Sequence, residues 1–585
     1  MRLEDYWGIG PKTRTLLVEE LGAERAIAAI ESGKVGTLVD AGVSRGRATQ
    51  ILRRVHGEAG LNTLASGDAR SVYDDLLSLA AEYAVTDGAA DRIRVLTPLT
   101  DPAAATDRLD EILAARDAWK SLDRSAREHV LEAFTEYDAA DGTDRAAVET
   151  ALALREAGLQ GDAFDALAEM DVDDLRDAAG ALGYLRESDD GIEVLEGADE
   201  ELDRNRARLA GVQEVEGSAL DVIESVRTAG TRDIEEFRSA VIEHVADETG
   251  IDRATIRAAA VEDAVDTADF VSGTLRNLVE ELETTVETRE SEVVDELRSA
   301  VGDAQSDVAV AVEAVSDIAF ALSLGRFAAE YDLRRPDLVT DGLAVRNARN
   351  PFLSGDVQPI TYAIGPHDLP ASEAIQPPAD DRVAVLTGAN SGGKTTLLET
   401  LCAVAILASM GLPVPAEEAR VGSFDHVVFH RRHASFNAGV LESTLRSVVP
   451  PLVEDGRTLM LVDEFEAITE PGRAADLLNG LVGLTVEREA LGVYVTHLAE
   501  DLAPLPAATR IDGIFAEGLT AELELRVDYQ PRFGTVGRST PEFIVSRLVA
   551  NAKDRTVRQG FEELASAVGQ EAVQRTLSDV RWTPD

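Results

Sequence analysis

A lysine and a threonine end the glycine-rich segment 388–395, which reads Gly-Ala-Asn-Ser-Gly-Gly-Lys-Thr. An apolar run precedes this segment and a helix-forming run follows it, which disfavours a chance match to the pattern. The spacing predicts a turn whose backbone N–H groups bind phosphate oxygens at a helix N-terminus. We expect Lys394 to bind the β- and γ-phosphates of ATP and Thr395 to bind Mg²⁺. The residues expected to bind nucleotide are Gly388, Ala389, Asn390, Ser391, Gly392, Gly393, Lys394, Thr395 and Thr396.

Two carboxylates end a second apolar run, at Asp463 and Glu464. At the carboxyl end of a parallel strand, Asp463 would hold Mg²⁺ and Glu464 would polarise the attacking water. His497 ends a third run and is expected to sense or stabilise the transition state at the γ-phosphate. The alternative interpretations are a solvated strand end for the carboxylates and a structural role for the histidine.

Four apolar β-type runs with helical stretches between them must position these side chains. Strands that alternate with helices predict a parallel sheet covered on both faces. We therefore expect an α/β P-loop domain over 340–540, followed by a helical segment over 541–585. The four runs are 381–387, 426–429, 458–463 and 491–496.

The region 101–335 has an almost wholly helical pattern and few prolines, which predicts an all-α core or lever. Within it, 270–301 spaces leucine and valine three, four or seven residues apart. This spacing fits a coiled coil, and it equally fits one face of an ordinary helical bundle. Residues 61–100 are expected to form a linker with some helix.

The first 60 residues contain two glycine-centred turns between short apolar helices, which resemble a pair of helix-hairpin-helix motifs. Such turns bring backbone N–H groups to a DNA phosphate without reading its sequence. This segment has nine basic and eight acidic residues, whereas the remaining 525 residues carry a net charge of −53. The alternative is a structural helical pair that contacts protein. The residues expected to bind DNA are Gly8, Gly10, Lys12, Arg14, Gly42, Arg45, Gly46 and Arg47.

The composition is strongly acidic, with 108 acidic against 56 basic residues and a net charge of −52. The acidic residues lie among regularly spaced apolar ones, so we expect a folded chain adapted to a salt-rich cytoplasm, as in halophilic archaea. An acidic interaction protein is the rival interpretation. The single cysteine, Cys402, excludes an intrachain disulfide and suits a reducing cytoplasm. No bilayer-length apolar run or signal peptide is evident, so no membrane partner is expected.

The order of these motifs resembles the ATPase domain of MutS-type proteins, the ABC-related ATPases of DNA mismatch repair and recombination. The similarity covers about 305–550. The resemblance near the end, Gly-Thr-Val-Gly-Arg-Ser over 534–539 with Ile-Val-Ser-Arg-Leu over 544–548, indicates the branch not dedicated to mismatch repair. The other matching segments are 345–353, 386–396, Ser-Phe-Asn over 435–437, 461–464 and 496–497.

The resemblance implies that two ATPase domains face each other in a homodimer. Ser435 and Asn437 of one subunit would approach the γ-phosphate bound by the other, and ATP would close the dimer around DNA. An ordinary helix N-cap is the alternative for Ser435.

The sequence also departs from the family pattern. Ala389 replaces a proline, Asn350 replaces a histidine, and 464–471 lacks the family's glycine. No segment resembles the mismatch-reading domain, and no nuclease domain follows the ATPase, so neither mismatch recognition nor intrinsic endonuclease activity is expected.

Together these features predict an ATP-hydrolysing clamp that binds DNA by its structure and acts in repair or recombination. The alternatives are another ABC-like DNA ATPase of the SMC type and a scaffold that binds nucleotide without turnover. The intact Lys394 and Glu464 argue against the scaffold, and the altered 465–471 segment argues for it.

Overall fold

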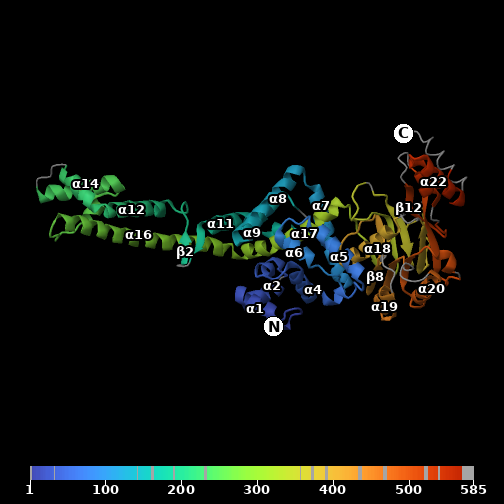
Figure 1. The fold of residues 1–585 in the computed structure, drawn as a ribbon. Helices are drawn as coiled ribbons and strands as arrows, with labels where there is room; N and C mark the ends of the chain where they lie inside the picture. The colour runs from blue at the N-terminus through green and yellow to red at the C-terminus, as the bar shows by residue number, and fades with distance from the viewer. Residues whose placement is uncertain are drawn as a thin grey trace. The chain divides into compact units, whose positions relative to one another are not determined.

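The structure is a computed structural model that divides into two compact units (Figure 1). The first comprises Met1–Thr135, Gly158–Asp165 and Ser316–Asp585, and the second comprises Glu136–Ala157 and Ala166–Val315. The residues that the structure describes are 3–31, 33–140, 142–159, 164–188, 191–228, 233–355, 357–370, 375–388, 393–431, 438–464, 471–502, 504–519, 525–537, 541–568 and 573.

A six-stranded sheet forms the centre of the first unit. Five neighbouring strands are parallel and the edge strand β12 is antiparallel to β11. The four predicted strands are confirmed within two residues, and β11 and β12 are additional. In spatial order the strands are β12 (Leu525–Phe533), β11 (Thr509–Leu519), β6 (Val383–Gly388), β10 (Leu491–Val495), β9 (Thr458–Asp463) and β8 (His426–His430).

Helices cover both faces of this sheet, so the central strands β6, β9 and β10 are buried throughout. Alternate side chains of each strand point to opposite faces. One set packs with α5 (Gly67–Ala81) and α18 (Lys394–Ser409). The other packs with α19 (Ala438–Val453) and α20 (Pro471–Glu487). The expected α/β domain with a covered parallel sheet is therefore present.

A second, four-stranded sheet shares the core around α18. Its apolar side chains, including Val345, Tyr362 and Val421, belong to the same cluster as those of α18. Its strands pair mostly antiparallel, so they do not follow the pattern of buried parallel strands and helices that predicted the first sheet. In spatial order they are β3 (Asp337–Val339), β7 (Glu418–Gly422), β4 (Leu343–Ala348) and β5 (Ile360–Ile364).

The N-terminal segment forms a small helical module with a core of its own, which includes Leu17, Ile30 and Ile51. Its elements are η1 (Leu3–Asp5), α1 (Pro11–Glu20), α2 (Ala23–Glu31), α3 (Val35–Asp40) and α4 (Arg45–Leu61).

Residues 61–100, expected to contain a linker, include α5 and α6 (Asp87–Arg94), and both helices join the largest core. The segment before α5 pairs with the edge strand β8. The N–H of Val427 donates to Thr63 O at 2.7 Å, and the N–H of Ala65 donates to Val427 O at 3.1 Å.

Other helices that lie wholly or largely in the first unit are α7 (Pro102–Ser121), α8 (Arg124–Ala139), α17 (Gln305–Glu330), α21 (Pro541–Asn551) and α22 (Arg555–Val568). Among the described residues, α17 alone is long and apolar enough to span a membrane. However, 67% of its most apolar window is buried inside the protein, as in a core helix.

The described residues of the second unit are helical apart from one hairpin, β1 (Leu185–Ser188) and β2 (Gly191–Val194), which the helical expectation missed. Figure 1 shows α12 (Glu200–Gly217) lying alongside the long helix α16 (Thr267–Asp303). The periodic stripe of α16 packs against several helices, so it is one face of a bundle. The other helices are α9 (Asp144–Glu156), α10 (Asp165–Glu169), α11 (Val172–Tyr184), α13 (Ala219–Thr228), α14 (Ile234–Thr249) and α15 (Arg253–Ala258).

Candidate nucleotide site

The connection from β6 to α18 begins and ends at glycines that tolerate no side chain. Gly388 has φ +135° and Gly393 has φ +72°. A Cβ on Gly388 would lie 2.3 Å from Ile514 O, and one on Gly393 would lie 2.7 Å from the Tyr529 ring. Both the backbone conformation and the close packing therefore require glycine. The predicted contacts Ala389, Asn390, Ser391 and Gly392 lie outside the described residues.

Lys394 and Thr395 open α18, and each contacts a strand end. The buried Lys394 Nζ donates to Gly388 O at 2.9 Å. Thr395 Oγ1 donates to Asp463 Oδ2 at 2.6 Å. An ammonium, a hydroxyl and a carboxylate thus converge at the N-terminus of one helix. This donor set fits a triphosphate with its Mg²⁺, since the ammonium suits phosphate oxygens and the oxygen ligands suit magnesium.

Glu464 follows Asp463 in a strained conformation and contacts His497. Its φ is +42°, which non-glycine residues rarely adopt and which recurs at functional sites. Its N–H donates to Val495 O at 3.1 Å, which fixes the backbone beside β10. His497 Nε2 lies 3.0 Å from Glu464 Oε1, where the imidazole N–H donates to the carboxylate. The structure therefore brings together the predicted pair at the ends of β9 and β10.

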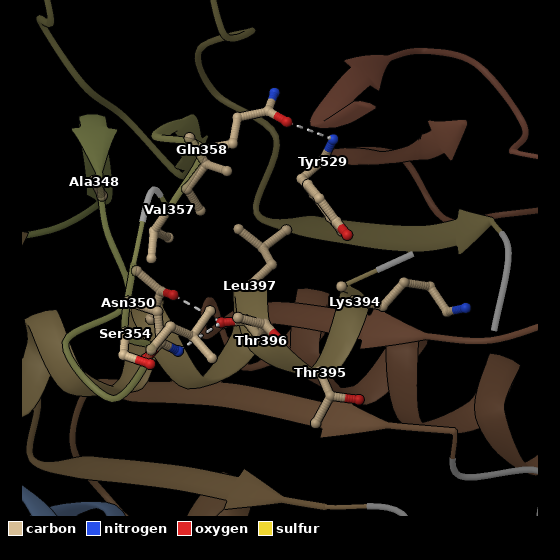
Figure 2. Close-up of a pocket in the computed structure, with 14 residues that line it drawn as sticks. Ala348, Asn350, Ser354, Val357, Gln358, Lys394, Thr395, Thr396, Leu397 and Tyr529 are labelled. Atoms are coloured by element: carbon tan, nitrogen blue, oxygen red, sulfur yellow. Dashed lines mark hydrogen bonds between the residues drawn. The ribbon is translucent and has the colours of Figure 1, made fainter. Parts of the chain in front are cut away.

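A cavity of about 520 Å³ opens beside the start of α18 (Figure 2). One wall comes from the segment between β4 and β5, and Tyr529 of β12 contributes another part. The N–H of Tyr529 donates to Gln358 Oε1 at 3.3 Å, which ties these two parts together. The lining residues are Ala348, Asn350, Leu353, Ser354, Val357, Gln358, Ile360, Gly393, Lys394, Thr395, Thr396, Leu397, Thr400 and Tyr529.

Asn350 occupies the position where the resemblance expects histidine. Its side chain is buried, and both its amide nitrogen and its amide oxygen make hydrogen bonds. Its Nδ2 donates to Glu399 Oε2 at 3.0 Å and lies 3.4 Å from Thr396 O. Its Oδ1 accepts from the N–H of Phe352 at 2.8 Å. The amide thereby holds the cavity wall against α18. In the sequence, Asn350 is notable only because it departs from the family motif. No sequence feature indicated a role for Tyr529 or Gln358.

The segment 534–537 packs beneath the strand end that leads into the glycine turn. The N–H of Gly537 donates to Thr387 Oγ1 at 2.6 Å, and that hydroxyl donates to Asp512 O at 3.0 Å. A Cβ on Gly537 would lie 2.9 Å from Gly388 Cα. The family resemblance included this segment as a motif, but the sequence did not indicate that it contacts the glycine turn.

Asp512 anchors the same region from a buried position. Tyr362 donates its hydroxyl to Asp512 Oδ2 at 2.8 Å, and Arg510 Nε donates to the same oxygen at 2.9 Å. Burial raises the pKa of the Asp512 carboxyl, while Arg510 beside it acts in the opposite direction. The pair is thus a desolvated contact within β11, and the hydroxyl of Tyr362 links it to β5.

The residues expected to bind DNA lie in the N-terminal module, where the two glycine turns contact each other. Arg47 Nη2 donates to Gly8 O at 2.6 Å, and Gly42 packs on Leu16. Arg14 pairs with Glu4 at 2.7 Å and Arg45 pairs with Asp91 at 3.0 Å. Of the rest, Gly10 caps α1, Lys12 lies in its exposed first turn, and Gly46 lies in the exposed first turn of α4.

The positions of Ser435 and Asn437 lie outside the described residues, so the structure says nothing of their approach to a partner site.

Residues 384–449 match MutS domain V. The DNA-binding protein MutS2 of Pyrococcus furiosus is 39% identical over 245 residues, which are 41% of this chain and 42% of that protein. The endonuclease MutS2 of Pelotomaculum thermopropionicum is 27% identical over 262 residues, 44% of this chain and 32% of that protein. The DNA mismatch repair protein MutS of Natronomonas pharaonis is 30% identical over 251 residues, 40% of this chain and 27% of that protein. The chain thus spans less than half the length of these relatives.

Proposed function

Because the chain belongs to the MutS family, we propose that it is an ATPase that hydrolyses ATP to open and close a dimeric clamp on DNA, in repair or recombination. The names of its relatives, which include a DNA-binding protein and a mismatch repair protein, support DNA as the partner. The observation that carries the ATPase proposal is the hydrogen bond from Thr395 to Asp463 beside the buried Lys394.

Each side chain at this site has a role that its chemistry supports. Lys394 binds the β- and γ-phosphates, and Thr395 with Asp463 holds Mg²⁺. Glu464 orients the attacking water and accepts its proton, while His497 holds the Glu464 carboxylate in place. Bound Mg²⁺-ATP would supply the phosphoanhydride bond that is hydrolysed.

The cavity wall suits the base of the nucleotide. Leu353, Val357 and Tyr529 offer apolar surface next to the first turn of α18. Ser354 and Gln358 line the same cavity and offer polar groups for the edge of the base. The glycine turn 388–393 would wrap the phosphates, with backbone donors from Gly388 through Thr396.

The clamp proposal assigns parts of the chain to separate tasks. Residues 1–60 bind DNA as paired helix-hairpin-helix motifs, joined by 61–100 to the rest. Residues 101–335 form the lever, 340–540 the P-loop ATPase domain and 541–585 a C-terminal helical segment. Ser435 and Asn437 complete the ATP site of a second copy in a homodimer. The acidic surface suits a salt-rich cytoplasm.

Two substitutions test the ATPase assignment in molar potassium chloride. Lys394→Ala should abolish ATP binding, whereas Glu464→Gln should retain binding and block hydrolysis. Lys120→Ala removes an exposed lysine near the end of α7, where it pairs with Asp332 at 3.4 Å, and serves as the control. Nucleotide affinity and phosphate release are the measurements. Wild-type hydrolysis rates in both site variants would refute the assignment.

Assays on the unmodified chain distinguish the clamp from a nucleotide-binding scaffold. ATP binding by the unmodified chain with no phosphate release would favour a nucleotide-binding scaffold, which the unusual 465–471 sequence first suggested. ATP-dependent changes in DNA affinity that disappear in Lys394→Ala would favour the clamp.

A further inference from the structure

A basic cavity of about 230 Å³ lies between the N-terminal module and α5, in a chain whose net charge is −52. Three arginines and one carboxylate line it, together with an indole and two side-chain amides. None of these residues is among the eight expected to bind DNA at the glycine turns, although several belong to the same N-terminal module, namely Trp7, Gln50, Arg53 and Arg54. The residues that the argument uses are Trp7, Gln50, Arg54, Asn62, Arg70 and Tyr73.

Trp7 is held in place yet remains open to solvent. Its side chain is 49% exposed, which is unusual for the largest apolar side chain. Gly8 turns the chain with φ +80°, and a Cβ there would lie 3.2 Å from Ile51. The Arg54 guanidinium lies 4.8 Å from the indole centroid. The ring is therefore a preformed surface for stacking.

Of the three arginines that line the cavity, Arg53 is held by several contacts, whereas Arg54 and Arg70 can contact a ligand. Arg53 pairs with Asp74 at 2.6 Å, donates to Arg94 O at 2.8 Å and lies over the Tyr73 ring, so it builds the floor. Among the described residues, Arg54 forms an ion pair with Glu58 alone, and this pair is weak because both side chains are more than a third exposed.

Arg70 is exposed and uses Nε toward Leu64 O at 3.0 Å. This contact fixes the side chain, and within the described part of the chain Nη1 and Nη2 of Arg70 make no hydrogen bond or ion pair. Arg53 and Asp74 neutralise each other as an ion pair. The positive charge of the cavity lining therefore comes from Arg54 and Arg70.

We propose that this cavity binds one nucleotide of a single DNA strand, and the proposal rests on the DNA-binding function proposed above. The base stacks on Trp7, and Arg54 and Arg70 contact its phosphates. Gln50 and Asn62 offer both donors and acceptors to the base edge, which suits any base.

Stacking requires an unpaired base, because a base inside a duplex is already covered on both faces. Aromatic platforms beside basic side chains are the usual solution for single strands. Stacking also depends less on counterion release than loose ion pairs do, so it persists in concentrated salt. A single-strand site would let the protein recognise tails, gaps or branches in DNA.

The test uses the full chain in molar potassium chloride, with oligothymidylate and a blunt duplex as probes. Trp7→Ala should weaken oligothymidylate binding at least about fivefold, as expected for one lost stacked base, and leave duplex affinity unchanged. Arg70→Gln should act in the same direction. Arg124→Gln, which makes the same charge change at an exposed position of α8, should have no effect.

Trp7→Phe keeps a ring and should retain most of the affinity, which guards against a folding defect in Trp7→Ala. The unmodified chain should lose tryptophan fluorescence on binding oligothymidylate, and Trp7→Phe should not. Equal losses for duplex and single strand in Trp7→Ala, or full affinity in both Trp7→Ala and Arg70→Gln, would overturn the cavity proposal. Absence of DNA binding by the unmodified chain would instead overturn the proposed function.

Discussion

Thr395 and Asp463 are 68 residues apart in the chain, and the Thr395 hydroxyl donates a 2.6 Å hydrogen bond to the Asp463 carboxylate. The contact joins the first turn of α18 to the end of β9. The two side chains are thereby held next to each other, as the proposed magnesium site requires, because a helix start and a buried strand end both resist movement.

Thr395→Val should lower Mg²⁺-dependent nucleotide affinity roughly tenfold or more, since it removes an oxygen ligand and the partner of Asp463. Thr395→Ser retains the hydroxyl and should behave as the unmodified chain. Nucleotide affinity at several magnesium concentrations measures the effect. Equal magnesium dependence in the valine and serine variants would contradict the assigned role.

The strained backbone at Glu464 predicts a difference between two variants that both lose the carboxylate. Glu464→Gly should be more stable than Glu464→Ala by about 1 kcal/mol, because glycine adopts φ +42° without steric cost. Both variants lose the contact with His497 and both should lose hydrolysis. Thermal unfolding of the two proteins side by side isolates the backbone contribution. An alanine variant at least as stable as the glycine variant would show that the strain is absent.

Gly537→Ala should raise the KM for ATP more than it lowers kcat, because its Cβ would press on Gly388 at the start of the glycine turn. Gly534→Ala is the control in the same segment. No atom lies within 4 Å of a Cβ added at Gly534, and its φ of +67°, which Gly537 does not share, adds backbone strain to this variant alone. Steady-state hydrolysis of both variants gives the comparison. Equal KM values would mean that the contact with Gly388 does not position the turn.

The ion pair between Asp199 and Arg289 predicts an acid-sensitive contribution in the second unit. The hydrogen bond from Arg289 lowers the pKa of Asp199 to about 2. A lowered pKa stabilises the fold above the unfolded value of about 4, and the contribution is lost as the pH falls toward about 2.

Asp199→Asn should therefore unfold at a lower temperature than the unmodified chain near neutral pH, with the difference shrinking between about pH 4 and pH 2. The amide can still cap α12, as Asp199 does through Leu202 N. Asp199→Ala also removes the cap and should keep part of its deficit in acid. A difference for Asp199→Asn that stays constant with pH would exclude the ion pair as its cause.

Much of the central sheet could be predicted because its strands are buried on both faces. The runs that became β6, β8, β9 and β10 are continuous apolar segments, which a sequence shows directly. The strands β3, β4, β5 and β7 pair mostly antiparallel and are not separated by long helices in the same regular way, so their identity depends on partners elsewhere in the chain. Residues 61–100 were expected to form a linker with some helix. In the structure α5 packs on β8 and α18, which are far along the chain, so its place in the core depends on tertiary contacts.

The sequence by itself determined the chemistry of the candidate nucleotide site: a glycine turn, Lys394, Thr395, Asp463, Glu464 and His497 at the ends of predicted strands. Those features are local, and parallel strands gather their carboxyl ends at one edge. Only the tertiary structure decided that Asn350 and Tyr529 wall the cavity, and that Gly537 lies against Gly388. It also placed Trp7 beside Arg54 and Arg70. Contacts between distant segments depend on how whole elements pack, and no local spacing encodes that packing.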